Sequence, residues 1–147
     1  MHKARYNTLR LSIALEPAGP FLIKAGGLSA DPTLPDMQFV RTAGPQGEIP
    51  YVPGASVKGV LRSFTEQALR TIGDTASWRW ACTTFPSDKE SCAHRLKDGD
   101  GAEPPAPAIY QRSCGACRIF GHTRLRGRLS VTDLLPAGKV QLETRYG

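Results

Sequence analysis

Four cysteines stand in the second half of the chain, and two of them, Cys114 and Cys117, are separated by two residues. This spacing lets two thiolates bind one Zn²⁺ from a tight turn. Cys82 and Cys92 can complete a tetrahedral site, with His94 as the alternative to Cys92. Because the Pro- and Gly-rich residues around them offer little core, a structural zinc would stabilise this segment. A redox pair is the alternative, but no thioredoxin-like strand–helix–strand context surrounds it.

A second candidate site is the start of a predicted helix, where cations stand in place of acids. Residues 51–62 read Tyr-Val-Pro-Gly-Ala-Ser-Val-Lys-Gly-Val-Leu-Arg. Free backbone N–H groups and the helix dipole favour an anion at such a start. Lys58 and Arg62, one turn apart on the same face, are unfavourable there unless an anion is present. The pattern predicts phosphate binding, although the glycine–lysine spacing is not that of a P-loop. An ordinary helix with solvated cations is the alternative.

A third cluster of basic residues follows the cysteine pair. It consists of Arg118, His122, Arg124, Arg126 and Arg128, which recur at short intervals around two glycines. Alternate cations before a strand line one face and can follow a phosphate backbone. The alternative is a solvated sheet edge whose charges prevent aggregation.

The composition and net charge indicate the class of protein and the kind of partner to which these sites belong. The chain has 147 residues, of which 40% are hydrophobic and 22% charged, as expected for one globular domain. Its net charge of +6 favours a polyanion, and nucleic acid first, as the partner. Fifteen glycines and twelve prolines exclude an all-helical bundle. We see no apolar run long enough for a membrane span and no secretory signal, so we expect a cytoplasmic protein with reduced cysteines.

The elements that must position these residues follow from periodicity. Thr8–Leu15 alternates and predicts a half-buried strand. Residues 25–49 read as a long loop, in which only Met37–Arg41 can pair as a strand. Apolar residues three and four apart, from Val57 to Ile72, predict a helix with an apolar stripe, with Ser56 as its N-cap and Gly73 as its stop.

The rest of the chain shows less regularity. Residues 74–113 have no clear period, and within them residues 98–105 read as an inserted loop. Arg128–Leu134 and Val140–Tyr146 predict two further strands, joined by a turn at residues 136–138.

Two segments resemble the RAMP superfamily of CRISPR proteins. Residues 51–62 are similar to the family pattern of an apolar pair, Pro-Gly, two small residues, an aliphatic residue, Lys-Gly, an aliphatic pair and Arg. Cys117–Gly121 followed by Gly127–Asp133 is similar to a second block, a Leu-Phe-Gly turn before a Gly-Arg-rich strand that ends in Asp. Together they span most of residues 8–135. The pattern resembles in particular the backbone subunits of type III effector complexes (Csm and Cmr type).

The resemblance implies a fold and partners. The fold would be α+β, a ferredoxin-like or RRM-like RAMP core forming a single domain over residues 1–147, with a zinc-knuckle insertion at 74–117. A zinc site in this insertion also recurs in the family. The partners would be the guide CRISPR RNA, the target RNA and other CRISPR effector subunits. The second helix and last strand of this core are not found before Gly147, so either the chain is a piece of a longer protein or neighbouring chains complete the sheet.

The resemblance also assigns contacts with RNA. Ser56, Lys58 and Arg62 would lie against the guide RNA backbone, in keeping with the phosphate site predicted from the helix start. The basic cluster that follows the cysteines would add Arg118, Arg124 and Arg126.

Finally, the resemblance implies cleavage of the target RNA by an Asp that precedes the Pro-Gly segment. Asp31 and Asp36 are the candidates, and the order of residues 36–41 fits the family better at Asp36. Such a carboxylate could hold a hydrated Mg²⁺ against the scissile phosphate while the RNA 2′-hydroxyl attacks, giving a 2′,3′-cyclic phosphate and a 5′-hydroxyl. Alternatively, both residues simply form turns beside proline. The subunit would then be a silent RNA-binding member of the complex. A zinc-stabilised protein-interaction domain is a further alternative.

Overall fold

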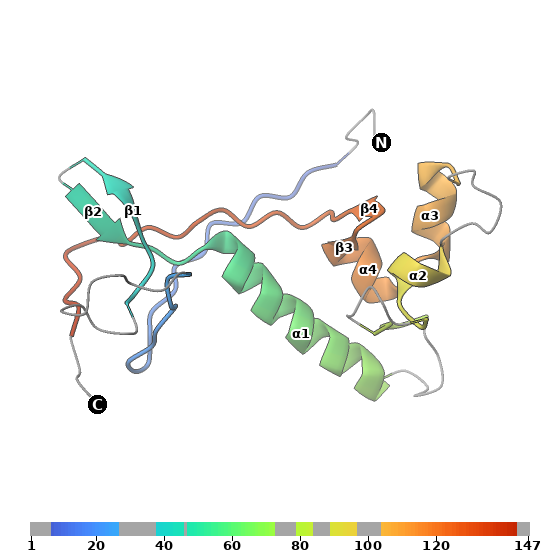
Figure 1. Ribbon diagram of the computed structural model, residues 1–147, viewed down its shortest axis with the longest axis horizontal. Coiled ribbons are helices and arrows are strands. Elements are labelled where there is room, and N and C mark those ends of the chain that lie inside the picture. Colours follow the sequence, from blue (N-terminus) through green and yellow to red (C-terminus); the bar gives the residue numbers. More distant parts are fainter. Residues whose placement is uncertain are drawn as a thin grey trace. The chain divides into compact units, whose positions relative to one another are not determined.

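The computed structural model describes residues 7–26, 38–45, 47–72, 79–83, 89–96 and 104–143. These residues form helices and two small antiparallel sheets (Figure 1), which confirms the predicted α+β class. No helix among them is both long and apolar enough to cross a membrane. The chain divides into two compact units, Leu9–Ala55 with Thr132–Gly147, and Met1–Thr8 with Ser56–Val131. The ferredoxin-like arrangement and the boundaries of the insertion stay predictions.

The first unit contains a β-hairpin that the sequence analysis missed. Strands β1 (Arg41–Gly44) and β2 (Gly47–Pro50) pair antiparallel, with Arg41 opposite Pro50. The positive φ of Gly47, +118°, allows the tight turn between them. Of the predicted strand Met37–Arg41, Met37 lies outside the described residues, Phe39 forms an isolated antiparallel bridge with Lys24, and Arg41 begins β1.

The three other predicted strands are wrong for the residues that the structure describes. Thr8–Leu15, Arg128–Leu134 and the described part of Val140–Tyr146 are not in strands, and Leu9 and Ile13 are 82% and 75% exposed. Their alternating pattern needs a neighbouring strand to supply backbone partners. In the described residues of these three segments, the strand pairing is limited to Leu134, which forms an isolated bridge with Val52.

The predicted helix is confirmed as α1, Gly54–Ile72, which ends one residue before Gly73. It begins two residues before the predicted N-cap Ser56, so that assignment was wrong. The backbone N–H of Gly54 donates instead to Oδ1 of Asp133 at 2.8 Å. A carboxylate from a distant segment thus meets the positive end of the helix. The predicted apolar stripe is not covered along its length, since Val60 and Phe64 are 71% and 70% exposed.

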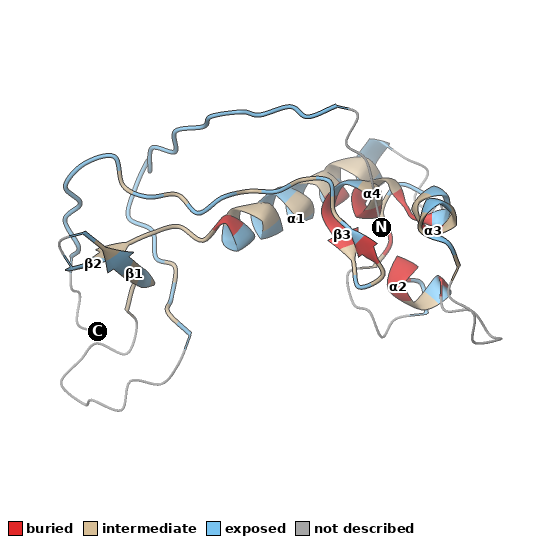
Figure 2. Cartoon of the chain, turned by 90° about the horizontal axis from the view of Figure 1, so that it is seen from above, coloured by how far each residue is buried: buried red, intermediate tan, exposed pale blue. Residues whose placement is uncertain are grey.

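The second unit contains a compact segment around the cysteines, which we call the knuckle (the described residues between 79 and 126). It comprises helices α2 (Cys92–Arg95), α3 (Ala106–Arg112) and α4 (Gly115–Phe120) and strands β3 (Gly121–His122) and β4 (Leu125–Arg126). Buried residues gather here (Figure 2). The buried core consists of Cys82, Cys92, Leu96, Ile109, Cys114, Ala116, Cys117 and Leu125.

One glycine fixes the turn from α4 into β3. Gly121 has a φ of +87°, and a Cβ atom there would lie 2.5 Å from the backbone nitrogen of Gly127. A side chain at this position would therefore clash with backbone as well as strain the turn. This requirement explains why glycine follows Phe120 in the second family-like block.

Candidate metal centre and basic surface

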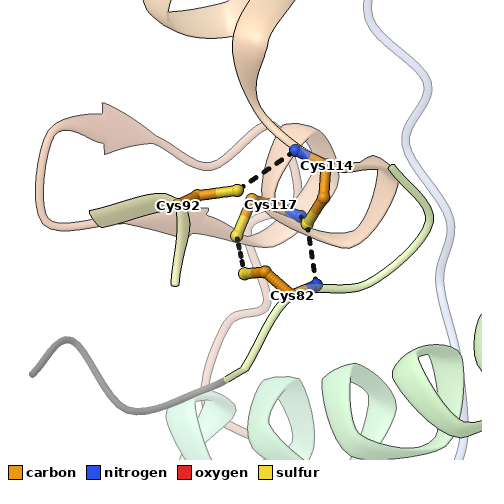
Figure 3. Close-up of side chains that lie close together, drawn as sticks. All are labelled: Cys82, Cys92, Cys114 and Cys117. Atoms are coloured by element: carbon orange, nitrogen blue, oxygen red, sulfur yellow. Dashed lines mark hydrogen bonds between the residues drawn. The ribbon is translucent and has the colours of Figure 1, made fainter. Parts of the chain in front are cut away.

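The four cysteine sulfurs lie together inside the knuckle (Figure 3). All four Sγ atoms are within 4.8 Å of one another, and the residues are at most 5% exposed. A tetrahedral Zn²⁺ site with bonds of about 2.3 Å requires sulfurs about 3.8 Å apart. The separation of 3.6 Å between the Sγ atoms of Cys82 and Cys117 is close to this value. The donor set therefore fits one Zn²⁺, and the predicted quartet is brought together.

Short elements position these sulfurs. Cys114 is the N-cap of α4, and its Sγ accepts the backbone N–H of Cys117 at 3.4 Å and that of Cys82 at 3.4 Å. The N–H of Cys114 donates in turn to Sγ of Cys92 at 3.2 Å, at the start of α2. Such N–H donors stabilise thiolates. His94 is not in the cluster of possible ligands, so among the described residues Cys92 is the one that completes it.

The thiols perturb one another's ionisation. Hydrogen bonds from the neighbouring cysteines, Cys117 first, lower the pKa of Cys114. Contact with Cys114 raises the pKa of Cys92 and of Cys117. Four thiols at this spacing cannot all ionise without a cation among them, and a divalent metal supplies that charge.

The structure gives Arg62 partners inside the protein. Its Nε donates to Oε1 of Glu66 at 2.8 Å, its Nη1 to the carbonyl oxygen of Gly121 at 3.0 Å, and its Nη2 to Sγ of Cys117 at 3.7 Å. The sequence analysis missed this role. The i, i+4 spacing to Glu66 was the available signal, but it does not reveal the cysteine beyond it. The RNA contact predicted for Arg62 stays a prediction.

Two further arginines of the predicted basic surface also bind carbonyl groups. Arg118 donates through Nε to the carbonyl oxygen of Tyr110 at 3.1 Å. Arg124 donates through Nη1 to the carbonyl oxygen of Leu96 at 2.7 Å. These bonds hold the C-terminal ends of α3 and α2. They add a structural role to both residues, whose predicted RNA contacts stay untested.

The remaining predicted RNA-binding residues are Ser56, Lys58 and Arg126. Ser56 and Arg126 are exposed and Lys58 is half-buried, and among the described residues the side chains of these three have no hydrogen bond or ion pair. Gly59, between Lys58 and the rest of α1, would meet no atom within 4 Å if it carried a Cβ. Because α1 begins at Gly54, Lys58 lies in its second turn, where the dipole is weaker. An anion at this position would therefore be attracted more by the charge of Lys58 than by the helix dipole.

The predicted catalytic residues Asp31 and Asp36 lie outside the described residues. Asp133, which the sequence analysis quoted only as the end of the second family-like block, serves instead at the start of α1. The sequence signal available for this contact was the position of Asp133 at the end of a Gly- and Arg-rich segment.

Comparison with known proteins identifies the family. A family model of the RAMP superfamily matches residues 15–145. Because the match covers most of the chain, this protein belongs to the RAMP superfamily, and the resemblance found in its two segments is confirmed. No curated protein and no solved structure gives a significant match. Family membership favours RNA and CRISPR-associated subunits as partners.

Proposed function

We propose that this protein is a guide-RNA-binding backbone subunit of a type III CRISPR effector complex. The observation that carries the proposal is the open surface at the start of α1, where Ser56, Lys58 and Gly59 have no described partner. A glycine inside a helix costs about 1 kcal/mol relative to alanine. Among the described residues, nothing beyond the helix itself packs against Gly59, so the close approach of an RNA backbone would account for a glycine at this position. Family membership supports the same partner.

The RNA contact is expected to depend on Lys58 and Arg126. Of the predicted RNA-binding cations, Arg62, Arg118 and Arg124 donate to groups inside the protein, whereas the side chains of Lys58 and Arg126 have no described partner and can neutralise phosphates. Each phosphate contact with single-stranded RNA contributes about 0.7 to the slope of log K against log salt concentration.

The binding test uses the full chain and a fluorescent single-stranded RNA. Lys58→Ala and Arg126→Ala should each weaken binding and each reduce the salt slope by about 0.7. Arg10→Ala, which removes an exposed cation at a distant position of the sequence, is the matched control and should change neither quantity. Equal effects of all three substitutions would mean that net charge alone drives binding. No binding by the unmodified chain at low salt would favour a protein-interaction domain.

Cleavage of the target RNA is the second part of the proposal. Asp36 would hold a hydrated Mg²⁺ at the scissile phosphate, and the 2′-hydroxyl of the target RNA would attack phosphorus and expel the 5′-oxygen. The 2′-hydroxyl proton would pass to solvent, and the departing 5′-oxygen would take up a proton from solvent. The products would carry a 2′,3′-cyclic phosphate and a 5′-hydroxyl. The order of residues 36–41 before the Pro-Gly segment supports Asp36 over Asp31.

The cleavage test uses the assembled complex with an RNA complementary to its guide. Asp36→Ala should abolish cleavage and leave target binding intact, whereas Asp31→Ala should cleave normally. Chelation followed by Mg²⁺ addition should stop and restore cleavage. An unmodified complex that binds the target without cutting it would identify a silent structural subunit and leave the RNA-binding proposal standing.

A further inference from the structure

Three charged residues of α1 form a row of ion pairs beside the knuckle. Glu66 is only 4% exposed and accepts a hydrogen bond from Nε of Arg62 at 2.8 Å. Nη2 of Arg70 lies 3.7 Å from the other carboxylate oxygen of Glu66. The i, i+4 spacing places all three on one side of the helix. A buried carboxylate between two arginines is stable only if both geometry and hydrogen bonding are kept.

The outer ends of both arginines reach the metal centre. Nη2 of Arg70 donates to the carbonyl oxygen of Cys82 at 2.9 Å. Arg62 contacts the centre through Sγ of Cys117 at 3.7 Å and holds the β3 turn through the carbonyl oxygen of Gly121 at 3.0 Å. Helix α1 is thus attached to the knuckle by polar contacts at two of the four cysteine residues.

The sulfurs differ in the donors that they receive. Sγ of Cys114 accepts two backbone N–H groups and Sγ of Cys92 accepts one. Among the described residues, the nitrogen donor that reaches Sγ of Cys117 comes from a side chain, the guanidinium of Arg62. Cys117 is therefore the ligand whose charge depends most on that side chain.

The charge balance of the site requires a cation outside the ligand shell. A divalent ion bound by four thiolates carries two excess negative charges, which are costly to bury. The Arg62 side chain is 23% exposed. An arginine guanidinium keeps its proton in proteins, whether buried or exposed. The guanidinium stays charged beside the cluster.

We propose that Arg62 is a positioning residue of the metal centre, which donates a charged hydrogen bond to the Cys117 thiolate and offsets the excess charge of the cluster. Glu66 fixes the guanidinium in this orientation. The proposal is independent of RNA binding, since every contact that supports it lies within residues 56–131. It gives the arginine of the first family-like block a function inside the protein.

The test measures metal binding directly. Arg62→Gln should weaken Zn²⁺ binding about 10-fold or more in competition with a chromophoric chelator, the scale on which loss of an outer-shell partner acts. In the Co²⁺-loaded protein, its sulfur-to-metal charge-transfer band should move to longer wavelength, because an unbonded thiolate releases electrons more easily. Arg62→Lys, which keeps the charge, should restore part of the affinity. Arg112→Gln, which changes an exposed arginine at the end of α3 in the same knuckle, is the matched control and should match the unmodified protein.

Two outcomes would overturn the proposal. One is an Arg62→Gln protein whose Zn²⁺ affinity and Co²⁺ spectrum are unchanged. The other is a protein of lower thermal stability whose charge-transfer band stays in place, since this would show a packing role alone. If Arg62→Gln does not fold, Glu66→Gln replaces it. That variant frees the guanidinium and should shift the band in the same direction by a smaller amount, and an unmoved band there would also reject the proposal.

Discussion

Cys114 is the residue on which the hydrogen bonds of the metal centre converge. Its Sγ accepts the N–H groups of Cys82 and Cys117, and its own N–H donates to Cys92. The CxxC spacing of Cys114 and Cys117 made this pair visible in the sequence. Cys82 and Cys92 were found only as the remaining cysteines, because the chain between them and the pair has no regular spacing.

We expect Cys114→Ser to abolish stoichiometric zinc binding. Serine is a poor ligand for a metal that prefers thiolate, so the centre would lose one of its four donors. Elemental analysis of the purified protein, with titration of the free thiols, measures the loss. His94→Ala is the matched control and should retain zinc, because His94 is outside the cluster. Zinc retained by Cys114→Ser would exclude this ligand set, and zinc lost by His94→Ala would favour His94 over Cys92 as a ligand.

His122 is held in its neutral form. Its Nδ1 accepts the backbone N–H of Arg124 at 3.3 Å, and its Nε2 lies 3.0 Å from Oγ of Ser113, whose hydroxyl donates to the carbonyl oxygen of Ile109. Burial lowers the pKa of His122 below its ordinary value of 6.5, and the charges of Arg62 and Arg124 act in the same direction, against Cys114. Protonation at Nδ1 would break the bond from Arg124.

This residue should make the free energy of unfolding depend on pH. The unfolded chain binds the His122 proton at a higher pH than the folded chain does, so its contribution is complete above pH 6.5 and is lost as the pH falls through the lowered pKa. His122→Gln should show a smaller loss of stability in denaturant unfolding between neutral and mildly acidic pH. The comparison is limited to pH values at which bound zinc is unchanged. Identical pH profiles for the two proteins would contradict this expectation.

At the scale of elements, α1 shows how far local pattern predicts structure. Its apolar spacing and Gly73 gave its type and its end correctly. Its start was misplaced, because the group that meets the first N–H belongs to Asp133, 79 residues away. The knuckle helices were missed for a related reason. They are short and are held by cysteines and by arginine bonds to carbonyls, which leave no periodic apolar signature.

Asp133→Ala should weaken the start of α1. The loss of an N-capping group costs about 1 kcal/mol. Asp133→Asn should lose less, since its amide oxygen can still accept the N–H of Gly54 and only the charge is missing. Denaturant unfolding with hydrogen exchange at residues 54–57 measures both changes. Faster exchange confined to other parts of α1 would argue against this role for Asp133.

At the scale of the whole molecule, the composition of the buried core indicates how strongly the knuckle would depend on a bound metal. Four of the eight buried residues that pack together in the described part of the knuckle are the cysteines, which leaves few apolar side chains to hold it. A segment with so little apolar core depends on a cross-link or a metal. The sequence analysis predicted such a dependence from the abundance of glycine and proline, and it stays a prediction.

Removal of zinc by a chelator should therefore unfold the knuckle selectively. Amide protons of the knuckle core, such as those of Ile109 and Leu125, should lose protection from exchange, whereas the β1–β2 hairpin, which lies in the other unit, should exchange as before. Added Zn²⁺ should restore protection. Hydrogen exchange followed by mass spectrometry measures both segments at once. An apoprotein with full protection at Ile109 would mean that the apolar core suffices without metal.

Two contacts join the start of α1 to a segment about 80 residues further along the chain. They are the bridge between Val52 and Leu134 and the hydrogen bond from Gly54 to Asp133. During translation, a chain that grows by about 5–20 residues per second needs roughly 4–16 s to cover the 79 positions between these partners. Throughout that interval the first turn of the helix has been synthesised but lacks its carboxylate. The start of α1 is therefore completed late in synthesis, after all four cysteines have been incorporated.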